Sequence, residues 1–103
     1  MRLREKVALV TGAGQGIGEG IALAFAREGA RVLVAELRPH RVERTVARIR
    51  EGGGQSTGVV ADVGVRADVE RMVAAAIEAY GQLDVLVNNA QGYALHTPLE
   101  QVS

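Results

Sequence analysis

A run of closely spaced glycines is the feature of this sequence that most directly predicts chemistry. Residues 10–18 read VTGAGQGIG and join a short valine-rich run to a stretch with helical periodicity. Glycines at a strand-to-helix turn allow positive φ and let the backbone approach a pyrophosphate without interference from a Cβ atom. The helix N-terminus then offers unpaired N–H groups and the positive end of its dipole to the phosphates. We therefore expect Gly12, Gly16 and Gly18 to belong to a dinucleotide-binding turn.

An acidic residue follows the glycines at the spacing that such a site needs. Glu36 ends the second apolar run, about twenty residues further along the chain. A carboxylate there accepts hydrogen bonds from both hydroxyls of the adenosine ribose and repels a 2′-phosphate, so it favours NAD over NADP. The alternative is a solvated acid at a strand end, with Arg38 available to pair with it or to hold a 2′-phosphate. We predict that NAD is the cofactor.

The elements that must position these residues alternate along the chain. Four short, continuous apolar runs predict strands buried on both faces, which are typical of a parallel sheet, at residues 7–10, 32–35, 59–61 and 85–87. Apolar periodicity and glycines at the helix exits predict helices at residues 16–28, 39–51 and 67–80. Right-handed crossovers between such units give a layered α/β fold. We expect one domain over residues 1–103, without an internal linker.

Composition excludes several other classes of protein. The 103 residues carry 12 basic and 12 acidic side chains, which argues against nucleic acid or an anionic membrane as a partner. Cysteine is absent, so disulfides, a thiolate nucleophile and the usual zinc sites are excluded. The sequence shows neither a signal-peptide core nor a membrane-spanning run, so we expect a cytoplasmic protein. We interpret four arginines on the middle helix as a solvated face rather than a phosphate-binding strip: Arg41, Arg44, Arg48 and Arg50.

Two motifs resemble the signatures of classical short-chain dehydrogenases/reductases. Residues 11–18 match T-G-x-x-x-G-[IL]-G, and residues 88–90 match the first three positions of N-N-A-G. The two motifs lie at the expected separation, and the resemblance covers essentially the whole chain. It implies a Rossmann-type doubly wound parallel sheet, represented by its first four strands and three helices. It also implies an NAD(H)-dependent oxidoreductase that acts on an alcohol or carbonyl substrate.

The resemblance further implies cofactor contacts at positions that match the family. The glycine turn with Gln15 and Ile17 would lie along the pyrophosphate, Glu36 and Leu37 would meet the adenosine ribose, Asp62 and Val63 would flank the adenine, and Asn89 and Ala90 would line the nearer ribose. On local chemistry alone, Asp62 is more simply an ordinary turn residue, and Asn88 is expected to be structural. Gln91 departs from the family, which usually has glycine there.

The catalytic residues of the family have no counterpart in this chain. Hydride transfer in the family depends on an upstream serine and a Y-x-x-x-K pair, whereas Lys6 is the only lysine here. Tyr80 and Tyr93 are each followed four residues later by a residue other than lysine, and His96 is more simply a surface residue. We therefore assign no catalytic residue, expect none of the usual metal ligands, and predict that the chain alone is inactive.

The position of the last residues suggests that the chain is part of something longer. The fourth predicted strand would be left as an exposed edge, so we expect a truncated form, a proteolytic fragment or one piece of a split chain. The full-length enzyme would be a homo-oligomer by resemblance. Two alternatives stay open: a non-catalytic nucleotide-binding module, and a nucleotide-sugar epimerase of the extended relatives, which the glycine spacing favours less.

Overall fold

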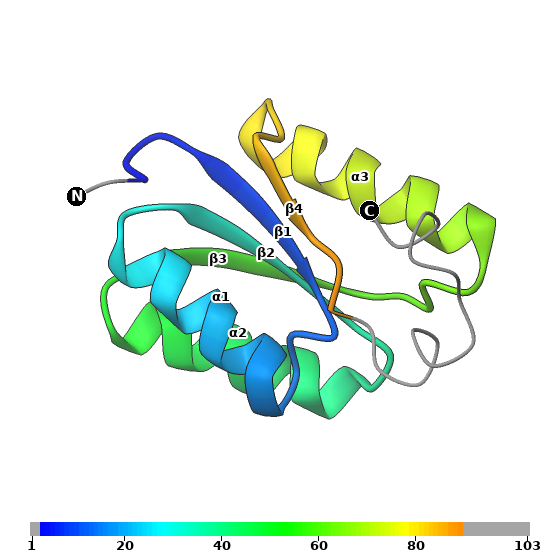
Figure 1. Cartoon of the computed structure of the whole chain (residues 1–103), viewed down its shortest axis with the longest axis horizontal. Coiled ribbons are helices and arrows are strands. Elements are labelled where there is room, and N and C mark those ends of the chain that lie inside the picture. The colour runs from blue at the N-terminus through cyan, green and yellow to red at the C-terminus, as the bar shows by residue number, and fades with distance from the viewer. Residues whose placement is uncertain (1–2, 90–103) are drawn as a thin grey trace.

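Strands and helices alternate along the whole of the part that the computed structural model describes, residues 3–89. In chain order the elements are β1 (Val7–Thr11), α1 (Gly16–Arg27), β2 (Arg31–Glu36), α2 (Pro39–Glu51), β3 (Gln55–Val60), α3 (Arg66–Tyr80) and β4 (Val85–Val87). The strands form one parallel sheet in the order β3-β2-β1-β4 (Figure 1). The predicted α/β class, with the first four strands and three helices of a Rossmann-type sheet, is therefore confirmed.

The two faces of the sheet carry separate apolar cores. Helices α1 and α2 cover one face and α3 covers the other (Figure 1). Because side chains alternate along a strand, Val10, Val32 and Val34 pack toward α1 and α2, whereas Leu9 and Leu33 pack toward Met72 of α3. This burial on both faces explains why the central strands β1 and β2 are continuous valine-rich runs.

The outer strands differ from the sequence prediction. β3 begins at Gln55 rather than at residue 59, and its residues alternate in exposure; Leu86 at the centre of β4 is 55% exposed. Full burial of these two strands was therefore a wrong prediction. The reason is their position: within residues 3–89 each pairs with a neighbour on one side only, β3 with β2 and β4 with β1.

Gly58 explains how α2 packs closely on β3, whose first half is polar. A Cβ at this glycine would lie 2.3 Å from Cγ1 of Val42, so its absence lets α2 pack directly on the strand. The signal in the sequence was a single glycine, which by itself does not separate a packed strand from a turn.

Parallel pairing brings the carboxyl ends of all four strands to one edge of the sheet. Thr11, Glu36 and Val60 end β1, β2 and β3 at this edge, and Val87 ends β4. Ligands of open α/β sheets bind outside the carboxyl ends of the strands. The loops that carry the predicted site residues therefore lie together at this edge.

Within residues 3–89 no helix has the length and apolar character needed to cross a bilayer.

Candidate functional site

The turn after β1 has the conformation that its glycines predict. Gly12 and Gly16 have φ of 61° and 58°, in the left-handed region that a glycine adopts without strain. A Cβ at Gly18 would lie 2.0 Å from the carbonyl oxygen of Gly12, so the first turn of α1 packs directly on the loop. The N-terminus of α1 is consequently held at the carboxyl edge of the sheet, where its first N–H groups have no intrahelical acceptor.

Glu36 is buried beside this turn. The residue is 8% exposed; its Oε1 accepts from the N–H of Gly14 at 3.2 Å, and its Oε2 accepts from the N–H of Arg38 at 3.0 Å. These two contacts fix the carboxylate between the glycine turn and the end of β2. Since a carboxylate has about four acceptor positions, it retains capacity for further donors such as ribose hydroxyls.

The loop after β3 is held by two charged residues of α3, Asp68 and Arg71. Asp68 Oδ2 accepts from the N–H of Asp62 at 2.9 Å, and Arg71 donates to the carbonyl of Val60 at 2.8 Å and pairs with Asp68 at 3.2 Å. The hydrogen bond from Asp62 lowers the pKa of Asp68, and Arg71 lowers it further. Oδ1 of Asp62 accepts from the N–H of Gly64 at 2.8 Å, so Asp62 has the turn-forming role that local chemistry suggested.

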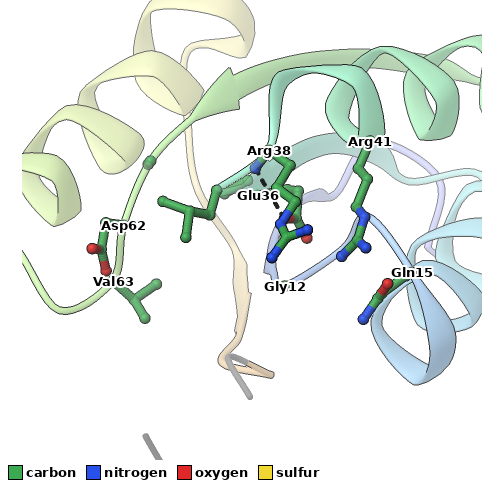
Figure 2. A pocket seen from close by; sticks show the side chains of 10 residues that line it. Gly12, Gln15, Glu36, Arg38, Arg41, Asp62 and Val63 are labelled. Atoms are coloured by element: carbon green, nitrogen blue, oxygen red, sulfur yellow. Dashed lines mark hydrogen bonds between the residues drawn. The ribbon is translucent and has the colours of Figure 1, made fainter. Parts of the chain in front are cut away.

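These segments surround a pocket of about 200 Å³ (Figure 2). Its lining comprises Gly12, Gln15, Ala35, Glu36, Leu37, Arg38, Arg41, Ala61, Asp62 and Val63. The pocket thus brings together the predicted ribose and adenine residues with the start of the glycine turn. Gly16, Ile17 and Gly18 lie outside the pocket at the start of α1, and Ile17 is 67% exposed. Ala90, Gln91, Tyr93 and His96 lie outside the described residues.

Arg41 is a pocket residue that was not among the predicted site residues. It faces the pocket from the first turn of α2 (Figure 2). A signal was present, because a helix that starts three residues after Glu36 must place its first turn at the same edge of the sheet. The solvated-face interpretation of the arginines also missed contacts of Arg44 and Arg48 with Glu19 and of Arg50 with the carbonyl of Ser56.

The ends of β1 and β4 are joined through Thr11. Its hydroxyl accepts from the N–H of Asn89 at 2.8 Å, and it lies 3.1 Å from Oδ1 of Asn88 and 3.3 Å from the carbonyl of Val87, either of which can accept its hydrogen. Nδ2 of Asn89 is buried and has no hydrogen-bond partner within residues 3–89. A buried amide donor of this kind calls for an acceptor.

The residues present fit a dinucleotide. The glycine turn offers a surface that a Cβ would fill, the helix N-terminus suits a pyrophosphate, and the pocket places a carboxylate beside apolar side chains that suit a nucleoside. In contrast, the described part of the chain contains no group of three or more His, Cys, Asp or Glu side chains that could hold a metal ion.

Comparison with known proteins gives consistent matches. A family model described as short chain dehydrogenase matches residues 6–103. The chain is 44% identical over 99 residues to the uncharacterized oxidoreductase YxjF of Bacillus subtilis, covering 96% of this chain and 38% of that protein. It is 39% identical over 103 residues to the short-chain dehydrogenase/reductase homolog YusS of Bacillus subtilis, covering 99% of this chain and 94% of that protein.

The fold also matches solved structures closely. One is 7 alpha-hydroxysteroid dehydrogenase complexed with NADH and 7-oxo glycochenodeoxycholic acid, with a TM-score of 0.87 and 35% identity. The match covers 96% of this chain and 40% of the other. The chain therefore spans about two-fifths of the length of that enzyme and of YxjF, and nearly the full length of YusS.

Proposed function

Because the chain belongs to the short-chain dehydrogenase family, we propose that it is the NAD(H)-binding part of an oxidoreductase that acts on an alcohol or carbonyl substrate. The observation that carries this proposal is the pocket that joins the glycine turn to Glu36 and Asp62. The related hydroxysteroid dehydrogenase, whose structure contains NADH, supports the choice of cofactor class. Bound NAD would supply the group that accepts or donates a hydride.

Glu36 and Leu37 would hold the adenosine ribose. The Glu36 carboxylate is fixed by two backbone N–H groups, so its remaining acceptor positions are oriented before any ligand binds. Accepting from the two ribose hydroxyls uses this orientation, whereas a 2′-phosphate would bring negative charge against a buried carboxylate. Arg38 and Arg41 also line the pocket and would reduce that repulsion. We therefore expect a preference for NAD over NADP rather than an absolute exclusion.

The remaining contacts follow from the same edge of the sheet. Asp62 and Val63 would flank the adenine from the loop after β3. Gly12, Gln15, Gly16, Ile17 and Gly18 would contact the pyrophosphate through the turn and the first N–H groups of α1. Asn89, with its buried amide group, would lie with Ala90 beside the cofactor ribose that is nearer to the end of β4.

A non-catalytic nucleotide-binding role is the second candidate. The 103 residues contain no Y-x-x-x-K motif, and the chain aligns with 94% of the length of YusS. Both candidates require the same dinucleotide site, so binding can be tested before the reaction is known.

A calorimetric titration tests the proposed site. The full chain is titrated with NADH and with NADPH, alongside Glu36→Ala and the matched control Glu43→Ala, which removes an exposed acid from α2. We expect NADH to bind more tightly than NADPH, Glu36→Ala to weaken NADH binding about tenfold, and Glu43→Ala to leave it unchanged. Tighter binding of NADPH than of NADH would contradict the assignment. Equal NADH affinity of Glu36→Ala and the native chain would also contradict it, provided that circular dichroism shows both to be folded.

A further inference from the structure

Four side chains link α1 and α2 underneath the glycine turn, and we call this group the turn clamp: Glu19, Arg44, Thr45 and Arg48. Glu19 is 8% exposed and Thr45 is fully buried. Oε2 of Glu19 lies 3.2 Å from the Thr45 hydroxyl and accepts from Arg48 at 3.1 Å, while its Oε1 pairs with Arg44 at 3.6 Å. The carboxylate of Glu19, near the N-terminus of α1, is thus paired with two arginines of α2, Arg44 and Arg48.

The turn clamp also holds two carbonyl groups of the turn itself. The Thr45 hydroxyl lies 3.1 Å from the carbonyl oxygen of Ala13, and the Arg44 guanidinium donates to the carbonyl oxygen of Gly14. The N–H of the peptide between Ala13 and Gly14 donates to Glu36 on the opposite side. This peptide is therefore held at both ends, by α2 through its carbonyl and by β2 through its N–H.

The direction of these contacts matters for the next peptide. In a trans peptide the C=O and N–H groups point in opposite directions. Since the Gly14 carbonyl is held toward α2, the N–H of Gln15 points away from α2. The contacts of α2 thereby set the orientation of this turn amide.

We propose that Thr45 is a positioning residue for the cofactor, because its hydroxyl fixes the Ala13–Gly14 peptide and thereby the position of the next peptide, which carries the N–H of Gln15. The inference rests on the proposed function, since it assumes that the turn binds a dinucleotide. Thr45 acts through the turn and does not line the pocket. The side chain is suited to this role because a buried hydroxyl can donate to Ala13 or to Glu19, whereas an isosteric valine leaves both acceptors without this donor.

Three variants of the full chain separate this role from a general contribution to stability. Thr45→Val removes the donor at nearly constant volume, and Thr45→Ser restores it. Ser56→Ala is the control, because Ser56 is also buried and its hydroxyl donates to a backbone carbonyl, that of Val32, at 2.8 Å, but on β3 away from the turn. All affinities are measured at a temperature at which every variant is folded.

Two readouts are needed, one without cofactor. Amide hydrogen exchange, followed by NMR on the cofactor-free chain, reports whether the Gly14 N–H is still held. We expect Thr45→Val to accelerate exchange of that amide about tenfold and to weaken NADH binding about fivefold to tenfold. Thr45→Ser should restore both quantities to within about twofold of the native chain, and Ser56→Ala should change neither.

Each outcome decides the proposal. Unchanged exchange at Gly14 in Thr45→Val, or an affinity loss in Thr45→Val no larger than that in Ser56→Ala, would overturn the positioning role. Failure of the native chain to bind NADH would refute the proposed function, and exchange at Gly14 would then still show whether Thr45 orients the turn. The two failures are therefore distinguishable.

Discussion

Replacement of Gly18 by alanine is the perturbation whose effect follows most directly from the geometry. The added Cβ would lie 2.0 Å from the carbonyl oxygen of Gly12, 2.8 Å from its carbonyl carbon and 2.7 Å from Nδ2 of Asn89. Two of these atoms belong to the backbone and cannot rotate away, so α1 and the glycine turn must separate by about 1.4 Å to restore an ordinary contact of about 3.4 Å. Overpacking of this kind costs about 1–3 kcal/mol.

Gly20 provides the matched control in the same helix. A Cβ there meets no atom within 4 Å, so Gly20→Ala should gain the helix propensity of alanine, about 0.5–1 kcal/mol. For a domain of this size, about 1 kcal/mol corresponds to a shift of about 4–8 °C in Tm. Thermal and urea unfolding, followed by circular dichroism, should therefore show Gly18→Ala below the native chain and Gly20→Ala above it. Equal stability of the two variants would refute the close packing of α1 on the turn.

Three further predictions concern residues at the two ends of the strands. Thr11→Val should lower the free energy of unfolding by about 1–3 kcal/mol because it removes the hydroxyl that joins β1 to β4. Thr57→Val on β3 is the control, and both variants are measured in urea titrations. Equal losses of stability in the two variants would contradict this role of Thr11. Asp84 accepts from the N–H of Val7, which lowers its pKa below the usual 3.8, so the stability that it contributes is complete above that value and is lost as the pH falls through the folded-state pKa. The urea midpoint of Asp84→Asn should thus lie below that of the native chain at pH 7, with a difference that shrinks below about pH 3.8, and a constant difference would argue against the linkage. Arg71→Met should weaken NADH binding more than Arg66→Met does. Arg71 holds the loop that carries Asp62, whereas Arg66 forms an exposed pair with Glu70. Calorimetric titration of both variants with NADH tests this, and equal affinities would contradict the role of Arg71.

The central part of the fold could be predicted from the sequence because its residues leave few alternatives. The valine runs of β1 and β2 are buried on both faces, and Gly29, Gly53 and Gly81 adopt positive φ at the helix exits. β3 was less predictable, since Gln55 to Gly58 are polar or small and join the sheet through pairing with β2 and packing of α2. No local pattern in a sequence encodes such non-local pairing.

The candidate site was predictable to a similar extent. Glycine spacing and the position of Glu36 indicated the pocket, because both follow from the turn and the strand next to it. The turn clamp was not predicted: Glu19 and Thr45 are separated by 26 positions in the chain, and only the packing of α1 against α2 brings them together. Charged residues on a helix have the same sequence pattern whether they are solvated or hold a neighbouring loop.

The measurement that tests the account most directly is an NMR titration of the full chain with NADH, following every backbone amide. We expect the shifted amides to cluster at the carboxyl edge of the sheet, in residues 12–18, at Glu36 and at Asp62, with little change at Gly29 and Gln55 at the opposite edge. Shifts centred on the opposite edge, or none at millimolar NADH, would contradict the claim that this chain forms a dinucleotide-binding site.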